Sequence, residues 1–499
     1  VLSVAKGLAI NTGNFITSNT FAGLAAYGDS TKTVVTGTAF LSNSIGVLLS
    51  DATNIEVSNK GGVANTLASN TNFGLSASGN ASGSVVAGNV IMQNAQGMVL
   101  SGVQGLKVDA GNAVVNNTLA GLLVSGDSAG TTVAGSAFMN NGTGILLTGA
   151  KNLMINRTGG VGNTLMSNTN YGLYASGASD GTVIAGNAVV SNFMGIVLDN
   201  AQGLTINGDN YSGSNTAAGL AVYGNSTGTL ITGSVYVNNG TGVLLSDAKN
   251  VEISNKSGVA NTISSNVNYG LFASGACDGS VVAGNVLMYN SQGIVLGGAQ
   301  RFTINGRNSA DSNTDAGLVV SGDSTGTTVA GNAFLNNAIG VIISGASGLV
   351  FGGAGAAGNT VASNSAAGVL LIGACSGTQL VGNWIGLNGL GISLSAASGL
   401  TINGSNVVAA SSKGAAFVAT GDCSGTVVSD NLFTSSSYGV LLNAAQKLTV
   451  NGGNRITGNT LFGLYAAGLS TGTTVTGNTI SGNGTDIDTT NASGGTFQS

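Results

Sequence analysis

The chain has 499 residues, only 6% of them charged, and a formal net charge of −5, so it has no basic patch for nucleic acid or an anionic membrane. It contains 84 glycines but neither proline, which cannot donate to a strand ladder, nor histidine, the commonest general base and metal ligand. Its apolar runs are shorter than the roughly 18 residues of a membrane span. We therefore expect paired strands, with no cofactor, no nucleic-acid partner and no membrane insertion.

A glycine followed by a large apolar residue recurs along the whole sequence, and we call it the marker glycine. The first copies, Gly23, Gly46, Gly74 and Gly97, follow one another at intervals of 23, 28 and 23 residues. The pattern then restarts at Gly121, 98 residues after Gly23. Periods of this length indicate a solenoid, in which each repeat packs only against its neighbours.

Each repeat contains three short segments of β type. In the second repeat these are residues 46–50, 54–57 and 65–68, joined by turns of Gly, Asn, Ser and Asp. No segment has the length and the 3.6-residue period of a helix. The predicted fold class is therefore all-β, a single-stranded parallel β-helix (solenoid) of about 20 rungs. We assign residues 1–485 to this coil and residues 486–499 to a C-terminal end segment.

Asparagine recurs three or four residues before the marker glycine. Because an amide both donates and accepts, stacked copies can bond along a column. Asparagine also tolerates the left-handed conformation that sharp corners need. We predict a structural ladder at these positions. Its members are Asn43, Asn70, Asn94, Asn117, Asn141, Asn168, Asn192, Asn215, Asn239, Asn266 and Asn290.

Residues that could carry chemistry are few and far apart. Cys277, Cys375 and Cys423 occupy equivalent positions at least two rungs apart, too far for a disulfide. A turn aspartate recurs, but Asp29 and Asp127 are four rungs, about 19 Å, apart. Paired carboxylates of glycoside hydrolases lie within about 10 Å of each other. We therefore expect no catalytic site and no metal site.

The second residue after each marker glycine is apolar in most repeats, although two-residue alternation directs it away from the core. A continuous apolar stripe of this kind usually marks an interface. The alternative is that these strands are apolar by propensity and that long neighbouring side chains cover the face. We predict a lateral interface at these positions. Its residues are Leu48, Val99, Leu123, Leu146, Tyr174, Val197, Leu244, Phe272, Val295, Val319, Ile342 and Leu370.

The repeat resembles the right-handed parallel β-helix proteins of bacteria. The marker glycine with its alternating apolar residues, the Gly-Asn turn, and the phrases at residues 352–364 and 377–386 carry this resemblance. It extends over nearly the whole chain and implies a right-handed coil. The family includes lyases, hydrolases, epimerases, adhesins and surface fibres, so the resemblance leaves the function open.

These features favour a non-catalytic extracellular structural protein of the bacterial cell surface. We expect a rigid rod that forms a fibre, sheath or adhesin stalk by lateral or head-to-tail association with copies of itself. The repeats begin and end without an obvious polar cap, so either further domains or other copies would cover the strand edges. One alternative is a glycan-binding adhesin in which Phe73, Tyr171 and Tyr269 contact a surface polysaccharide. A second alternative is a divergent polysaccharide lyase or hydrolase.

Overall fold

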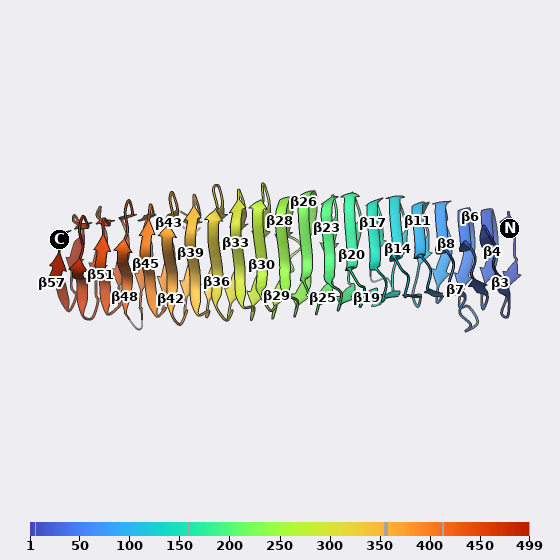
Figure 1. Ribbon diagram of the computed structural model, residues 1–499, viewed down its shortest axis with the longest axis horizontal. Helices are drawn as coiled ribbons and strands as arrows, with labels where there is room; N and C mark the ends of the chain where they lie inside the picture. Colours follow the sequence, from blue (N-terminus) through green and yellow to red (C-terminus); the bar gives the residue numbers. More distant parts are fainter. Residues whose placement is uncertain (5, 157–159, 354–357, 412–413, 499) are drawn as a thin grey trace. The chain divides into compact units, whose positions relative to one another are not determined.

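The computed structural model describes residues 1–498 except residues 5, 157–159, 354–357 and 412–413 (Figure 1). Residues 354–357, inside one of the two family-like phrases, therefore lie outside the described part. Contacts divide the chain into two compact units. Unit 1 is residues 1–244, 250–252 and 256–261, and unit 2 is residues 245–249, 253–255 and 262–499. No helix in the described part is long and apolar enough to cross a membrane.

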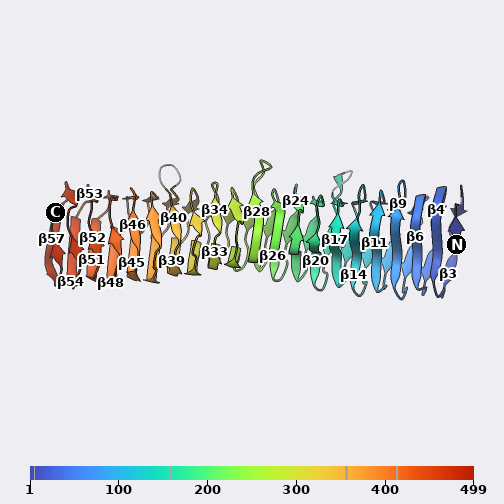
Figure 2. The same ribbon diagram turned by 90° about the horizontal axis from the view of Figure 1, so that it is seen from above.

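Each unit is a coil of parallel strands with three faces, which we call the long-strand, the middle and the short-strand sheet (Figures 1 and 2). The long-strand and middle sheets are joined in one hydrogen-bonded sheet, because some strands run through both. In unit 1 the long-strand sheet contains β1 (Leu2–Ser3), β4 (Ala22–Val35), β6 (Ile45–Ser58), β8 (Phe73–Asn80), β11 (Gln96–Gln104), β14 (Ala120–Asp127), β17 (Thr143–Lys151), β20 (Tyr171–Ala178), β23 (Met194–Gln202) and β26 (Ala218–Ile231). The middle sheet contains the distal halves of β4, β6 and β26 with β2 (Ala9–Ile10), β9 (Val85–Ala87), β12 (Lys107–Val108), β15 (Thr132–Val133), β18 (Met154–Ile155), β21 (Val183–Ala185) and β24 (Thr205–Asn207). The short-strand sheet contains β3 (Phe15–Thr17), β5 (Ala39–Leu41), β7 (Thr66–Ala68), β10 (Val90–Met92), β13 (Ala113–Val115), β16 (Ala137–Met139), β19 (Thr164–Met166), β22 (Ala188–Val190), β25 (Tyr211–Gly213) and β27 (Val235–Val237).

Unit 2 has the same three sheets, and the residues of β28 (Thr241–Ser254) are divided between the units. Its long-strand sheet contains β30 (Tyr269–Ala276), β33 (Gln292–Gln300), β36 (Ala316–Asp323), β39 (Ile339–Ser347), β42 (Ala367–Ala374), β45 (Leu390–Ser398), β48 (Ala415–Asp422), β51 (Tyr438–Gln446), β54 (Phe462–Leu469) and β57 (Thr485–Ser493). Its middle sheet contains β31 (Val281–Ala283), β34 (Thr303–Asn305), β37 (Thr328–Val329), β40 (Val350–Gly352), β43 (Gln379–Val381), β46 (Thr401–Asn403), β49 (Val427–Val428), β52 (Thr449–Val450), β55 (Thr474–Val475) and β58 (Thr496–Phe497). Its short-strand sheet contains β29 (Thr262–Ser264), β32 (Val286–Met288), β35 (Ser309–Asp311), β38 (Ala333–Leu335), β41 (Thr360–Ala362), β44 (Trp384–Gly386), β47 (Val407–Ala409), β50 (Leu432–Thr434), β53 (Arg455–Thr457) and β56 (Thr479–Ser481).

Equivalent residues of successive rungs lie directly above one another. In β17, Ile145 pairs with Leu122 of the strand before and with Leu173 of the strand after, all in parallel. Ile145 and Leu147 point inward and are fully buried. The predicted β-helix and its inward rows are therefore confirmed.

The asparagine ladder is confirmed, and its predicted members are all buried. The Asn141 Nδ2 donates to the Asn168 Oδ1 at 3.2 Å and to the Val114 carbonyl at 3.0 Å, and the Asn141 backbone N–H also donates to the Asn168 Oδ1. The predicted position of the left-handed corner was wrong. The left-handed corner is at the residue before the ladder asparagine, for example Asn140 with a φ of 54°, because the ladder residue must aim its own N–H along the column.

The marker glycine is required by the close approach of neighbouring rungs. A Cβ atom on Gly144 would lie 2.5 Å from the carbonyl oxygen of Gly172 and 2.9 Å from the Asn168 Nδ2. Any side chain at this position would push the rungs apart, which explains the recurrence of glycine.

Strand pairing continues past residue 485, where the sequence suggests an end segment. β57 pairs with β54, and β58 pairs with β55. Asp486 stands one repeat after the marker Gly463, and its Oδ1 accepts hydrogen bonds from the backbone N–H and the Nδ2 of Asn483 at 3.1 and 3.0 Å. The carboxylate thus takes the place that the next asparagine amide has in the other rungs.

Candidate functional site: an outward apolar stripe

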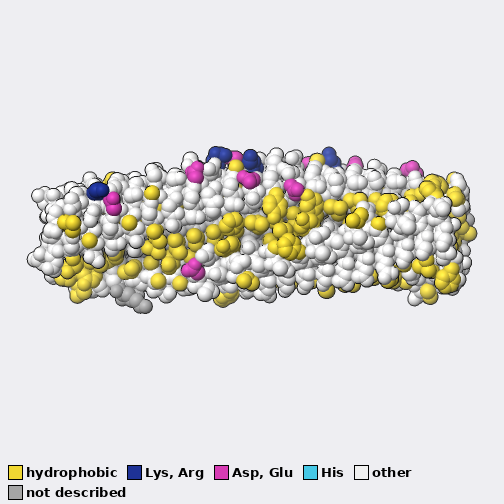
Figure 3. Space-filling model, in the orientation of Figure 1, with side chains coloured by type: hydrophobic (Ala, Val, Ile, Leu, Met, Phe, Trp, Pro, Cys, Tyr) yellow, Lys and Arg dark blue, Asp and Glu magenta, His cyan; other side chains and the backbone are white. Residues whose placement is uncertain are grey.

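The outward face of the long-strand sheet carries a row of apolar side chains, one on most strands. In β14, Leu123 is half-buried and stands between the buried Leu122 and Val124. The parallel register places it beside Val99 of β11 and Leu146 of β17. In Figure 3 hydrophobic side chains gather in a band on the visible face, and most charged side chains lie along one border. The predicted outward row therefore exists.

The predicted interface residues occupy this row in both units, and most of them are half-buried. Val197 and Val295 differ, with exposed fractions of only 2% and 7%, so these two side chains offer little surface to a partner. Val295 pairs with Phe272 in the preceding strand. The row is interrupted by Ser76, which pairs with both Leu48 and Val99.

Val197 is buried because aromatic side chains cover it. With Ala218 and Ala221 it forms a small apolar cluster on the outside of the coil, against which Tyr171, Tyr174, Met194, Tyr223 and Leu244 pack. The rings of Tyr171 and Tyr174 lie 5.2 Å apart. In this region long side chains of the same sheet cover the apolar surface, as the alternative to an interface predicts.

The tyrosine cluster has one polar edge. The Tyr174 hydroxyl donates to the Asp199 Oδ2 at 2.8 Å. Burial, together with this hydrogen bond and the nearby carboxylate charge, raises the pKa of Tyr174 to about 12. The hydroxyl therefore stays protonated at neutral pH and anchors the ring.

The aromatic residues proposed to contact glycans all stand just before a marker glycine and point outward. Phe73, Tyr171 and Tyr269 are each half-buried at the start of a long strand. Tyr269 stacks on Phe272 with 5.4 Å between ring centroids. These pairs are small aromatic platforms on the same face as the stripe.

The recurring turn aspartates are hydrogen-bonded parts of the turns. The Asp29 Oδ1 accepts from the hydroxyl of Thr31 at 2.6 Å, and also from Thr53 and Asn54 in the next rung. The Thr31 bond contributes most to lowering the pKa of Asp29. Asp323 accepts in the same way from Thr325, which lowers its pKa. Each carboxylate holds its own turn, as expected for Asx turns.

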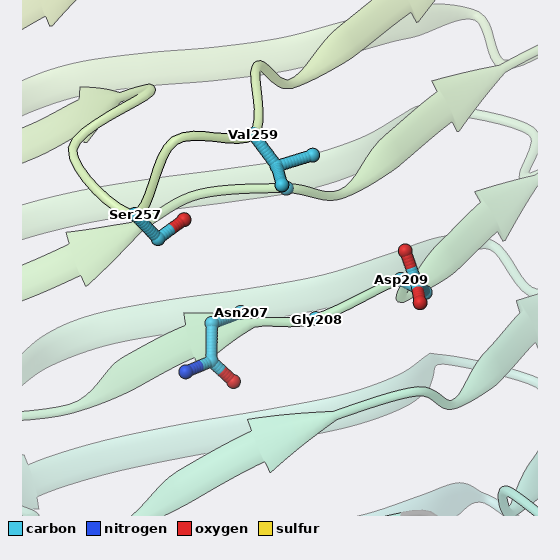
Figure 4. Close-up of a pocket in the computed structure, with 6 residues that line it drawn as sticks. Asn207, Gly208, Asp209, Ser257 and Val259 are labelled. Carbon is cyan, nitrogen blue, oxygen red and sulfur yellow. The ribbon is translucent and has the colours of Figure 1, made fainter.

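A shallow hollow of about 300 Å³ lies in unit 1, away from the predicted residues (Figure 4). Asn207, Gly208 and Asp209 line it from one turn, and Ser257 and Val259 line it from the loop of a longer rung. Within the described residues no three acidic, cysteine or histidine side chains gather to hold a metal ion. The hollow therefore presents amide, hydroxyl and carboxylate oxygens beside the apolar side chain of Val259.

A second outward apolar surface, which was not predicted from the sequence, lies on the short-strand sheet of unit 1. Val90 and Met92 of β10 both point outward and are half-buried, on either side of the fully buried Ile91. The same pattern recurs in β13, β16, β19 and β22. The available signal was an apolar residue on each side of the inward residue in all of these triplets except β19, where Thr164 takes one of the two positions.

Two family sequence models match the chain. The model of the periplasmic copper-binding protein (NosD) matches residues 195–355 and 401–499, and the model of the right-handed beta helix region matches residues 11–189 and 90–236. The chain belongs to the right-handed parallel β-helix proteins that these models describe. The family confirms the resemblance and the right-handed coil.

Solved structures with a similar coil are distant from this β-helix protein. DFA-IIIase from Arthrobacter chlorophenolicus A6 without its lid is 12% identical over 54% of this chain and 84% of that chain, with a TM-score of 0.40. The A-module of the mannuronan C-5 epimerase AlgE6 from Azotobacter vinelandii is 12% identical over 84% and 91%, with a TM-score of 0.32. PfbA, a surface adhesin of Streptococcus pneumoniae, is 11% identical over 76% and 82%, with a TM-score of 0.20. Likenesses this distant carry no functional argument. Curated protein sequences gave no match.

The residues of this chain do not fit a copper site. Copper in proteins is bound by imidazole, thiolate or thioether ligands. The sequence has no histidine. All three cysteines are buried as free thiols, and burial raises the pKa of Cys277 and Cys423 to about 11. The thiols are thus scattered and protonated. The thioethers of Met139 and Met166 stand side by side in paired strands, but two thioethers without an imidazole or a thiolate make an incomplete copper site, and we derive no metal chemistry from them.

Proposed function

We propose that this β-helix protein is a non-catalytic structural protein that acts outside the cytoplasm, as a surface fibre, sheath or adhesin stalk that associates laterally. The observation that carries the proposal is the half-exposed apolar row of the long-strand sheet. Through β11, β14 and β17 it runs without a polar interruption as Val99, Leu123 and Leu146. A second coil has the same rung spacing of about 4.8 Å, so equivalent rows can interlock.

Two further features support this role. The matching family model describes periplasmic proteins, which favours a location outside the cytoplasm. The turn aspartates, which are the recurring carboxylates of the chain, are engaged in turn hydrogen bonds rather than paired with one another. A surface with so few charges and such regular strand pairing suits a passive, durable material.

Paired charge substitutions in the row test the proposal. Leu123→Asp together with Leu146→Asp places two carboxylates in adjacent rungs of the stripe, where contact with a partner would desolvate them. We expect lateral assembly to weaken at least tenfold, measured by sedimentation velocity and negative-stain microscopy. Ser125→Asp is the matched control, because Ser125 also points outward from β14, two residues further along the strand.

The variants must keep the fold for the comparison to be valid, which circular dichroism and thermal unfolding will establish. Unchanged assembly of the folded double variant would remove the stripe from the proposal. Equal weakening by Ser125→Asp would mean that added charge alone, rather than loss of an apolar contact, opposes assembly.

A glycan-binding role is a second candidate, favoured by the aromatic pairs on the same face. The pair of Tyr171 and Tyr174 and the pair of Tyr269 and Phe272 offer ring faces for the apolar side of a sugar. Glycan-array binding by the wild type that is lost on Tyr171→Ala or Tyr269→Ala would favour this role. Binding unaffected by both substitutions would reject these platforms.

A further inference from the structure

The short-strand sheet of unit 1 presents two apolar columns side by side. The first and third residues of each three-residue strand point outward and are half-buried, while the second is buried. The register is parallel and unbroken from β10 to β22. The first column is Val90, Ala113, Ala137, Thr164 and Ala188, and the third column is Met92, Val115, Met139, Met166 and Val190.

The two columns differ in side-chain size. The first contains mainly alanine and threonine and forms a shallow trough, which we call the small column. The third contains only methionine and valine and forms a ridge, which we call the large column. The patch ends at β25, where the ring of Tyr211 lies over Gly213 and would be within 3 Å of a Cβ atom there.

The face carries no charge within these strands, whereas the same sheet of unit 2 does. From β10 to β22 the strands contain no Lys, Arg, Asp or Glu. In unit 2, Asp311 stands in the third column next to Leu335, and Arg455 is exposed in the first column. A charged or nucleic-acid partner has nothing to bind on the unit 1 face.

We propose that this face of unit 1 docks against the same face of a second copy of the chain. A two-fold axis along the coil direction places the large column of one copy over the small column of the other, so that ridge fills trough in both directions. A two-fold axis along the strands would instead oppose ridge to ridge and leave a void between the small columns. The two coils therefore run parallel, with each rung facing its own equivalent.

The size of the face sets the strength of this contact. Five strands about 4.8 Å apart and a width of about 10 Å give roughly 240 Å² per copy. A stable dimer buries about 800 Å² on each side. The pair forms at high local concentration, as in an assembled fibre or sheath.

This inference rests on the proposed structural role but concerns a different face, so separate variants test the two. Met139→Asp places a carboxylate in the middle of the large column. Leu335→Asp is the matched control, because Leu335 has the equivalent position in β38 of unit 2, 196 residues later. At the highest attainable protein concentration we expect sedimentation equilibrium to show a wild-type dimer, at least tenfold weaker association of Met139→Asp, and an unchanged dimer for Leu335→Asp.

Cross-linking tests the parallel arrangement. A protein with Ala137→Cys is mixed with a protein with Met139→Cys and treated with a short thiol-specific linker. We expect at least tenfold more cross-linked product than in a mixture of Ala137→Cys with Leu41→Cys, because β5 lies four rungs, about 19 Å, away. The native cysteines are buried, and the wild type serves as the background.

Several results would overturn the inference. A wild type that stays monomeric at the highest concentration, or equal cross-linking in both mixtures, would do so. If Met139→Asp fails to fold, Met139→Gln replaces it, and an undiminished dimer in that variant counts against the face. Loss of the dimer in Leu123→Asp/Leu146→Asp but not in Met139→Asp would assign self-association to the stripe alone. Binding of neutral phosphatidylcholine vesicles without a dimer would assign the face to lipid instead.

Discussion

The two units contain the same repeat but differ in the residues of the asparagine ladder. In unit 1 asparagine follows asparagine, as where Asn141 bonds to Asn168 and Asn168 bonds to Asn192. In unit 2 the ladder changes to serine at Ser411 and Ser436. The backbone bond survives there, because the Ser411 N–H donates to the Ser436 Oγ at 3.1 Å. The bond between side chains is lost.

In the same part of unit 2 a marker glycine is replaced by alanine. A single steric cause would explain both this replacement and the change from asparagine to serine. The register that pairs Ala415 with Tyr438 places Ala416 at the marker position facing the ladder residue Ser436. A Cβ at a unit 1 marker such as Gly144 would press on the Asn168 amide. A serine is shorter than an asparagine, so it leaves room for the methyl group. We therefore predict that a marker glycine and the asparagine it faces in the next rung are energetically coupled.

We expect the largest loss of stability when a ladder asparagine of unit 1 is replaced. Asn168→Ala would leave the buried N–H of Asn141 and the carbonyl of Phe138 without their present partner. Each such group costs about 1–3 kcal/mol, so we expect a loss of about 4 kcal/mol in the free energy of unfolding. Ser436→Ala removes the bond from the Ser411 N–H and the bond that the Ser436 Oγ donates to the carbonyl of Thr434, a carbonyl of its own rung, and should cost about 2 kcal/mol. Equilibrium denaturation measures both, and equal losses would contradict the comparison.

Substitution of a marker glycine should have the next largest effect. We expect Gly144→Ala to cost about 3 kcal/mol, because the carbonyl of Gly172 is backbone and cannot move aside cheaply. Ala416→Gly in unit 2 should cost only about 0.5–1 kcal/mol, through added freedom of the unfolded chain. Thermal and denaturant unfolding of the two variants provide the test. A mild effect of Gly144→Ala would show that the rungs can separate more easily than their spacing suggests.

The combination of alanine at the marker position and serine in the ladder can be introduced into unit 1. Gly144→Ala combined with Asn168→Ser recreates the pair formed by Ala416 and Ser436. We expect the double variant to be more stable than the sum of the single losses, by about 1–2 kcal/mol, because the serine accommodates the new methyl group. Strict additivity in this double-mutant cycle would show that the two changes in unit 2 are unrelated.

The strands, the inward rows and the ladder could be predicted because all three depend on identity between rungs, which spacing records directly. The burial of Val197 could not be predicted, because it depends on how Tyr174 and Tyr223 of other rungs fold over it. The residue at the left-handed corner was also misplaced, since several residue types, such as Asn140 and Ser167, take this conformation. The short-strand face was missed because three residues are too few to display a two-residue period.

The smallest expected effect concerns a buried column of turn residues, in which Ser128 of unit 1 and Cys423 of unit 2 differ in one side-chain atom. Ser128 in unit 1 has a buried hydroxyl with no hydrogen-bond partner among the described residues. Cys423 takes the equivalent position in unit 2, and its thiol is 3.8 Å from the carbonyl oxygen of Thr420. A thiol loses less than a hydroxyl when it leaves water, so Ser128→Cys should stabilise the chain by about 1 kcal/mol.

The reverse change, Cys423→Ser, should destabilise the chain by a similar amount, and denaturant midpoints of the two variants measure both. Thiol reactivity gives an independent reading. Burial raises the pKa of Cys423 to about 11, so little thiolate forms at neutral pH. A cysteine at position 128 should likewise resist iodoacetamide until the chain unfolds. Rapid alkylation of the folded Ser128→Cys protein would mean that unit 1 opens locally where unit 2 stays closed, and a loss of stability would mean that this column has no room for sulfur.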